Sequence, residues 1–228
     1  MKKAAKFHKI FIYLGLALTL FSVKIEAQET VDKTVATVSD SVRTELITYS
    51  DLLWQLALQP NAPLNPPTSD DLNRALQLII NQRLFALEAQ RLPQATPTGD
   101  ETDAEIKRVL ALFPSTAEFE SRLRQVGFDS VKDDNFERMM AQRVAIEKYI
   151  DFRFRSFVVI TAEDEEKYFQ NVFVPEFRRK NPGLLMPTIT EKRVEINQIL
   201  TDQKVITEIE KFLDEAKRRA EIIVLSEV

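Results

Sequence analysis

Apolar residues recur at three- and four-residue spacing along most of this sequence, and proline or glycine interrupts the pattern repeatedly. The clearest stretch runs from Leu72 to Leu92, where one face is apolar and the opposite face carries Asn, Gln, Arg and Glu. This period is that of an α-helix that buries one face against a core. The pattern therefore predicts a mainly α-helical fold. The predicted helices cover 51–58, 72–92, 101–113, 115–126, 130–150 and 190–219, with a further helix from 161 that Pro175 kinks or breaks.

Residues that favour helix ends support these boundaries. Ser, Thr and Asp accept hydrogen bonds from the free N–H groups of the first helical turn, and an acidic residue three positions later can return one. The predicted N-caps are Thr48 or Ser50, Thr68 or Ser69, Ser115 with Glu118, Ser130 with Asp133, Thr161 with Asp164, and Thr190. Gly127 is expected to end the helix over 115–126.

Short β-branched runs lie near opposite ends of the sequence. TVATV covers 34–38, a second run over 45–48 follows after a turn, and IIVL covers 222–225. An isolated strand leaves backbone N–H and C=O groups unpaired, so short strands need a partner. We predict that the terminal run pairs with 35–38, and that removal of residues 222–228 destabilises the whole domain.

The first 27 residues have the order of a secretory signal peptide. A lysine-rich start leads into an uncharged stretch over 10–23, and the small residue Ala27 follows Lys24 and Glu26. This order of basic head, apolar middle and small residue is typical of cleaved signals. An uncleaved membrane anchor is the alternative, but the stretch is shorter than the ~20 residues that a spanning helix needs. We expect cleavage near Ala27, export to the periplasm and no stable membrane insertion of the mature chain.

Export would also change the charge of the chain. Residues 1–27 hold five Lys and one Glu, so their removal changes the formal net charge from −4 to −8. An acidic surface repels phosphate backbones. Nucleic acid is therefore not an expected partner.

The mature chain lacks the residue types that many catalytic sites require. The sole His, His8, lies in the predicted signal peptide, and the chain has no Cys. Zinc sites and nucleophile systems built on His or Cys therefore lose essential residues, and the scattered glycines form no phosphate-binding loop. Carboxylate pairs remain a chemical alternative, but Glu163–Glu166 are explained as a first helical turn, where acids favour the helix dipole. We expect no catalytic residue, no metal and no cofactor.

Because the residue composition argues against catalysis, we expect the protein to function by binding other proteins. A reversible apolar binding surface needs large or adaptable side chains, which Phe and Met supply. Three phenylalanines at four-residue spacing form one stripe in the helix from 161. The candidate peptide-binding residues are Met139, Met140, Phe152, Phe154, Phe157, Phe169, Phe173 and Phe177. The alternative for each of them is burial in the core, since Phe is often buried.

Five segments occur in an order that resembles a known family. They are TVATVSD, LNRALQLIINQRLFALEAQRL, FESRLRQVGFD, VVITAEDEEKYFQ and RVEINQILTDQK, and they lie within residues 34–225. In order and spacing they resemble the SurA-type periplasmic chaperones, whose N-terminal domain is related to the peptide-binding part of trigger factor. The resemblance implies a multi-helix SurA N-terminal-like domain over 28–228, completed by the last helix and strand over 190–225. It also implies an ATP-independent holdase that binds unfolded outer-membrane or secreted polypeptides.

The chain departs from the family pattern before its last helix. Relatives often insert parvulin-type prolyl isomerase domains there, whereas here residues 181–189 alone occupy that place. Parvulin sites also use His, which the mature chain lacks, so isomerase activity is not carried over. A prolyl isomerase with an unrecognised site and a scaffold with one fixed protein partner stay open as alternatives, and so does a homodimer.

Overall fold

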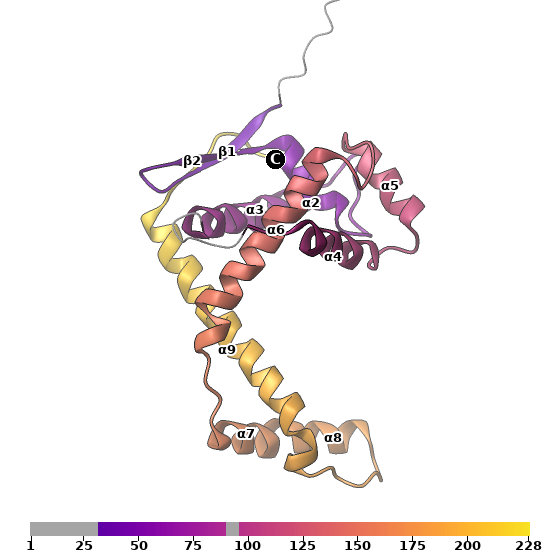
Figure 1. Ribbon diagram of the computed structural model, residues 1–228, viewed down its shortest axis with the longest axis vertical. Helices are drawn as coiled ribbons and strands as arrows, with labels where there is room; N and C mark the ends of the chain where they lie inside the picture. The colour runs from indigo at the N-terminus through magenta and orange to yellow at the C-terminus, as the bar shows by residue number, and fades with distance from the viewer. Residues whose placement is uncertain (1–31, 90–95) are drawn as a thin grey trace, which may run out of the picture. The chain divides into compact units, whose positions relative to one another are not determined.

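The computed structural model describes residues 32–89 and 96–228. The predicted signal peptide over 1–27 and the predicted helix end at Leu92 lie outside these residues. The described part is mainly α-helical, as predicted, and contains one small antiparallel sheet (Figure 1). Its elements are β1 (Thr34–Ser39), β2 (Thr44–Thr48), α2 (Tyr49–Ala57), α3 (Ser69–Ala89), α4 (Gly99–Leu110), α5 (Thr116–Gln125), α6 (Asp134–Arg153), the 3-10 turn η1 (Arg155–Phe157), α7 (Ala162–Tyr168), the π-helical turn η2 (Phe169–Phe173), α8 (Val174–Lys180), α9 (Ile189–Arg219) and β3 (Glu221–Val224).

The sheet brings the two ends of the described chain together. β1 is the central strand, with β2 and β3 on either side (Figure 1). Val38 pairs with Ile222 and Ala36 pairs with Val224, which confirms the predicted pairing of the terminal run with 35–38. Ala36 and Val38 are fully buried in one apolar cluster with residues of α2 and α3. The strands are therefore part of the core and not an appendage to the helices.

Helix starts follow the capping rules, and four predicted caps are confirmed. At the start of α3, Thr68 accepts the backbone N–H of Asp71 at 3.1 Å. Thr48 and Thr161 each form a capping box, with Asp51 and Asp164 as the returning acids. Ser115 accepts the backbone N–H of Glu118 at 3.2 Å. Gly127 has a φ of 94° just after α5, a left-handed conformation that favours glycine, so it ends that helix as predicted.

Three other helix starts were predicted wrongly. α9 begins two residues before the predicted cap, because Thr188, and not Thr190, forms a capping box with Glu191. α4 likewise begins earlier than predicted, with Thr98 capping it and Glu101 as the returning acid. α6 is capped by Asp133 and not by Ser130. For α4 and α9 the correct cap is the Thr that has Glu three residues later, since that spacing lets the carboxylate reach the N–H of the cap.

Three apolar clusters hold most of the described chain together. The first lies between the sheet, α2 and α3, the second between α2 and α4 to α6, and the third between α3, α6 and α9. The second is rich in aromatic rings: Phe119 has no exposed surface and lies 4.6 Å from Phe113 and 5.8 Å from Phe136 between ring centroids. We call residues 34–89, 96–157 and 205–228, which supply nearly all of these clusters, the helical body.

Two charged side chains fix helices within the helical body. The guanidinium of Arg122 on α5 donates to four carbonyl oxygens at the end of α2 and beyond it, including those of Gln59 and Ala62, both at 2.8 Å. The carbonyls of Leu56 and Gln59 also accept the backbone N–H groups of Gln59 and Ala62, respectively, and the cation adds the further donors that carbonyls at the end of a helix need. Glu105 on α4 is buried and accepts from Arg143 on α6 at 2.9 Å.

The remaining helices pack chiefly against one another. α7, η2 and α8 contact each other in chain order, and α7 packs on α9. We call residues 161–204, which contain these helices and the first half of α9, the α7–α9 module. In Figure 1, α9 runs from the sheet to α7 and α8 and so belongs to both regions.

α9 buries opposite faces in its two halves. Ile196 in the first half and Val205 in the second are both buried. They are nine residues apart, which is about two and a half turns at 3.6 residues per turn, so they point to opposite sides of the helix. The predicted single stripe through 196, 199, 206, 209, 213 and 216 is therefore wrong at Ile206, which is 54% exposed. One straight helix has two partners here, and each partner requires its own apolar face.

Candidate peptide-binding surface

The contact between α7 and α9 combines the buried side chain of Ile196 with several polar interactions. Glu165 on α7 is buried, and its carboxylate accepts from Asn197 at 3.0 Å and from the guanidinium of Arg193 at 3.1 Å. Lys204 donates to Asp164 and to the carbonyl oxygen of Val159, both at 3.0 Å. The carboxylates of α7 therefore help to fix the helix on α9.

The pKa of the Asp164 carboxylate is lowered by its contacts in α7 and with α9. Its pKa is lowered to about 2, first by the backbone N–H of Thr161 and then by the hydrogen bond from Lys204. Both donors favour the charged form. Asp164 thus serves as the returning acid of the α7 cap and as the partner of α9, and both roles require it ionised.

The predicted aromatic stripe forms a continuous stack. Ring centroids lie 5.4 Å apart between Phe169 and Phe173 and 5.8 Å apart between Phe173 and Phe177, with interplanar angles of 15° and 26°. The predicted break at Pro175 takes the form of the π-helical turn η2 just before it. Proline has no N–H to donate to the carbonyl four residues earlier, so the local hydrogen-bond pattern changes. The rings nevertheless stay stacked across the break.

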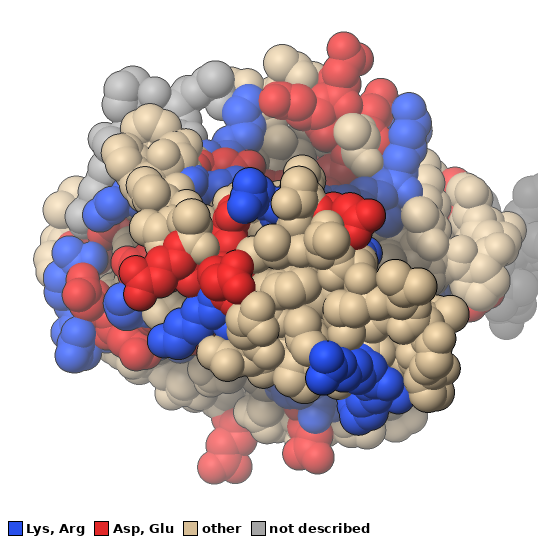
Figure 2. Space-filling model, turned by 90° about the horizontal axis from the view of Figure 1, so that it is seen from below, with Lys and Arg blue, Asp and Glu red and all other residues tan. Residues whose placement is uncertain are grey.

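Large apolar side chains are exposed in the α7–α9 module and in the segment that leads into it. Leu185 is 95% exposed and Val194 is 85% exposed, although neither is charged or polar. The other members of this group are Phe157, Val159, Val172 and Leu184. Figure 2 views the molecule from the α7–α8 end, and a wide uncharged area occupies this face with Lys, Arg, Asp and Glu along its edges. We call these six residues the exposed apolar group.

The predicted site residues are distributed over several places. Phe169, Phe173 and Phe177 come together in the stack, the first buried and the other two half-buried. Phe154 and Phe157 line one pocket of about 300 Å³ between η1 and α9, which Phe212 and four charged side chains complete.

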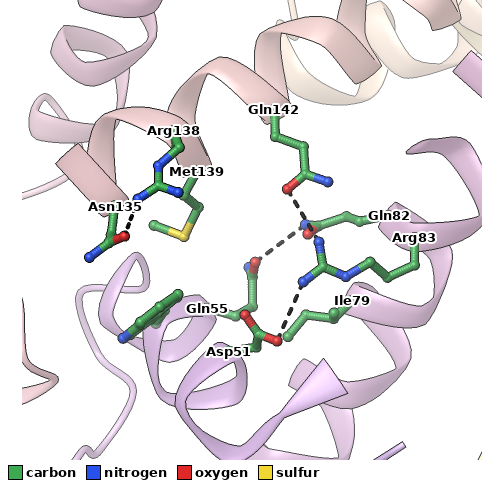
Figure 3. A pocket seen from close by; sticks show the side chains of 10 residues that line it. Asp51, Gln55, Ile79, Gln82, Arg83, Asn135, Arg138, Met139 and Gln142 are labelled. Carbon is green, nitrogen blue, oxygen red and sulfur yellow. Dashed lines mark hydrogen bonds and ion pairs between the residues drawn. The ribbon is translucent and has the colours of Figure 1, made fainter. Parts of the chain in front are cut away.

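The other three predicted residues lie elsewhere. Phe152 is 55% exposed near the end of α6. Met140 is fully buried in the second apolar cluster. Met139 lines a polar pocket between α2, α3 and α6 (Figure 3). Met140, Phe154 and Phe169 are core residues in this conformation, and Phe157 is the predicted residue that presents the most surface.

Sequence reasoning missed the leucines and valines of the exposed apolar group. The signal was present in GLLMP over 183–187, an apolar run between proline residues that has no helical period. Prolines on both sides keep such a run out of a helix or a central strand, so its side chains are not drawn into a core by periodicity. The predicted site residues were limited to Phe and Met, so they did not include this run.

Within the described ranges, no group of three or more Asp, Glu, His or Cys side chains is placed to hold a metal ion. In the same residues, none of the helices has both the length and the apolar character of a membrane span. The chain matches no protein-family model, and no curated protein matches it either.

Proposed function

We propose that this protein is an exported, ATP-independent chaperone of the SurA type, which holds unfolded outer-membrane or secreted polypeptides on the exposed apolar group. The observation that carries the proposal is the concentration of exposed large apolar side chains between residues 157 and 194, with Leu185 and Val194 almost fully in solvent. Contiguous exposed apolar surface is characteristic of sites that bind other proteins.

The physical character of this surface suits weak and reversible binding. Each client CH₂ group that leaves water contributes about 0.8 kcal/mol, and a few side chains offer enough area for transient association. Four of the six side chains lie on the α7–α9 module, which ion pairs help to hold on α9, so this surface can adjust to different sequences. Stable folding of the helical body is provided separately by the three buried clusters.

The arrangement of the chain ends also supports the SurA-type proposal. Pairing of β1 with β3 closes the helical body with the last helix and strand, which is the organisation that the sequence resemblance implies. Export remains a prediction from residues 1–27, which lie outside the described residues.

The proposal is tested by the aggregation of a urea-unfolded outer-membrane β-barrel protein after dilution into buffer without nucleotide. We expect equimolar wild-type protein to suppress aggregation. The triple variant Leu184→Ser, Leu185→Ser, Val194→Ser should lose most of this effect, because it removes half of the side chains of the group, among them the two most exposed.

A matched control separates loss of the surface from loss of apolar area in general. Leu112 is 61% exposed in the turn after α4, close to the 66% of Leu184. The control variant Leu112→Ser should suppress aggregation as wild type does. Equal suppression by the wild type and the triple variant would contradict the proposal. Capture of a single protein in a defined complex, with no effect on aggregation, would favour the scaffold alternative.

A further inference from the structure

A pocket of about 200 Å³ lies on the helical body between α2, α3 and α6, apart from the exposed apolar group (Figure 3). Its polar walls carry two arginines and a single acid, Asp51, together with several side-chain amides. Its apolar walls are parts of Ile79, Trp54 and Met139. The lining residues are Asp51, Trp54, Gln55, Ile79, Gln82, Arg83, Asn135, Arg138, Met139 and Gln142.

Arg83 has poorly satisfied hydrogen-bond donors. Its guanidinium donates to Gln142 at 3.3 Å and to Asp51 at 3.4 Å. Charge-assisted N–H···O bonds are usually about 2.7–2.9 Å long, so both contacts are long. Its Nε is buried and has no acceptor in the part of the chain that the structure describes. An arginine whose side chain is only 17% exposed thus keeps donor capacity unused.

The acid beside Arg83 does not fully balance its charge. The same carboxylate oxygen of Asp51 that faces Arg83 also accepts the backbone N–H of Thr48 at 3.0 Å, as part of the cap of α2. Its negative charge is therefore shared with the positive end of that helix. Asp51 is also half-buried. Water therefore does little to weaken the attraction between the Arg83 guanidinium and a negatively charged ligand in the pocket.

The second arginine stands on the opposite wall. Arg138 donates to the side-chain oxygen of Asn135, as Figure 3 shows, and to the carbonyl oxygen of Asp134 at 3.3 Å. The residues that the structure describes place no carboxylate within 4.0 Å of its guanidinium. Asp133 is close enough for Arg138 to contribute to lowering its pKa, but that carboxylate already caps α6. The pocket thus has one more cation than anion.

We propose that this pocket binds a small monocarboxylate with an apolar side chain. The carboxylate would accept hydrogen bonds from Nη1 and Nη2 of Arg83, which direct one N–H each at Gln142 and Asp51 and form a planar fork that matches a carboxylate. The unsatisfied Nε is buried out of reach of such a ligand. Gln82 donates to Gln55 and Gln142 accepts from Arg83, so these side-chain amides keep further donors and acceptors for a polar group of the ligand, such as the amide of an N-acylated amino acid. The apolar part of the ligand lies on Ile79, Trp54 and Met139.

The chain supplies its own probe for this site. Trp54 is the single tryptophan, and its indole N–H donates to the carbonyl oxygen of Val126 at 3.0 Å, which fixes the ring at the wall. Its fluorescence can therefore be titrated with N-acetyl-leucine and, at equal size, with N-acetyl-leucinamide, which lacks the carboxylate. We expect the acid to bind about tenfold more tightly than the amide, because hydrogen bonds to charged groups are about twice as strong as neutral ones.

Two arms distinguish a free metabolite from the end of a polypeptide. The tripeptide acetyl-Ala-Ala-Leu with a free carboxylate binds if the pocket admits a chain end, and its amidated form then binds more weakly. Binding of N-acetyl-leucine without binding of the tripeptide points to a free small acid. Either result supports the carboxylate site. Equal affinity for acid and amide, or no saturable response to either, would overturn it.

The variant Arg83→Gln tests the assigned residue. It should remove the preference for the acid, whereas Arg74→Gln on the same helix, whose side chain is 68% exposed, should keep it. Circular dichroism checks that each variant is folded. If Arg83→Gln does not fold, the exposed Arg138→Gln replaces it and should reduce the affinity for the acid severalfold. Retention of the full preference in a folded Arg83→Gln variant would contradict the proposal, and none of these measurements depends on chaperone activity.

Discussion

The helical body and the α7–α9 module are stabilised by different interactions. The body contains side chains with no exposed surface, such as Phe119 and Leu52, in contiguous apolar clusters. The module has a stack of three phenylalanines, ion pairs between α7 and α9, and leucines in solvent. The body therefore rests on extended apolar clusters, whereas the module buries few apolar side chains, among them Ile196 and Phe169, and adds polar contacts.

This difference predicts different stability for the two regions. Segments with few buried apolar contacts open at lower free energy than the core around them. The body should determine the global unfolding transition, and the module should open locally without it. A binding surface that adapts to many clients gains from such a division, because its changes of shape leave the core intact.

The largest expected effect is in the body. Phe119→Ala removes a fully buried ring that contacts Phe113 and Phe136, and it should lower the free energy of unfolding by about 3–5 kcal/mol through the cavity that it leaves. Urea unfolding followed by circular dichroism measures this. The control Leu112→Ala, at an exposed side chain, should stay within about 0.5 kcal/mol of wild type. Similar effects of the two variants would show that the second cluster is not the core of the body.

Deletion of residues 221–228 should have the next largest effect. It removes β3, the hydrogen bond of 2.8 Å from the Leu225 N–H to the carbonyl oxygen of Val35, and the partly buried Ile222 and Val228. Because a fully buried side chain of this size contributes about 1.5–3 kcal/mol and these two are only partly buried, we expect a loss of about 2–4 kcal/mol. The control is Leu225→Ser, at a side chain that is 56% exposed. A truncated chain that melts at the wild-type temperature would exclude β3 from the core.

The aromatic stack gives a smaller effect, confined to the module. Phe173→Ala removes both stacked contacts of the central ring, and since each aromatic pair is worth about 0.5–1.5 kcal/mol, the module should lose about 1–3 kcal/mol. Hydrogen exchange should become faster in 162–180 and stay unchanged in α2 to α6. Val172→Ala, at the neighbouring half-exposed side chain, is the control. Faster exchange throughout the body would mean that the two regions unfold as one.

The polar contact between α7 and α9 should contribute less. Glu165→Ala removes the acceptor of Asn197 and Arg193, and we expect a local loss of about 1 kcal/mol, because Arg193 is largely in solvent. Glu166→Ala on the same helix, whose carboxylate accepts from Gln170, is the matched control. Hydrogen exchange in residues 162–180 measures the local stability of both variants. An equal response to the two changes would argue against a specific α7–α9 contact.

The smallest expected effect is a dependence on pH at Asp164. Its pKa of about 2 lies below the ordinary value of 3.8, so its contribution is complete above the ordinary value and is lost as the pH falls through 2. A carboxyl ¹³C NMR titration measures the midpoint. Lys204→Gln should raise this pKa only in part, because the N–H of Thr161 is the larger cause. A wild-type midpoint near 3.8 would contradict the described geometry.

Local patterns predicted much of the secondary structure because the interactions that define it are local. The capping boxes at Thr48 and Thr161 and the glycine stop at Gly127 each depend on residues a few positions apart. The missed cap at Thr188 was also readable, since Glu191 stands three residues later while Thr190 has no such partner. The pairing of the chain ends followed from the need of each short strand for a partner.

The candidate sites depended on distant parts of the chain and were only partly predictable. Among the predicted residues, Phe157 is exposed and Met140 is in the core, although both belong to residue types that suit either place. Leu184 and Leu185 escaped notice because exposure depends on which elements cover a segment. The pocket at Arg83 combines residues of α2, α3 and α6, and their separations in sequence carry no common pattern.

The sequence by itself determined the starts of four helices, that Pro175 interrupts a further helix and that the two terminal strands meet, because short-range hydrogen bonds and strand pairing decide these features. The tertiary structure alone decided that α9 buries Ile196 on one side and Val205 on the other, since a helix takes its buried face from its partners. The same holds for the donor capacity left at Arg83. Whether a polar group is satisfied depends on the positions of acceptors supplied by other helices, and no spacing along one helix encodes them.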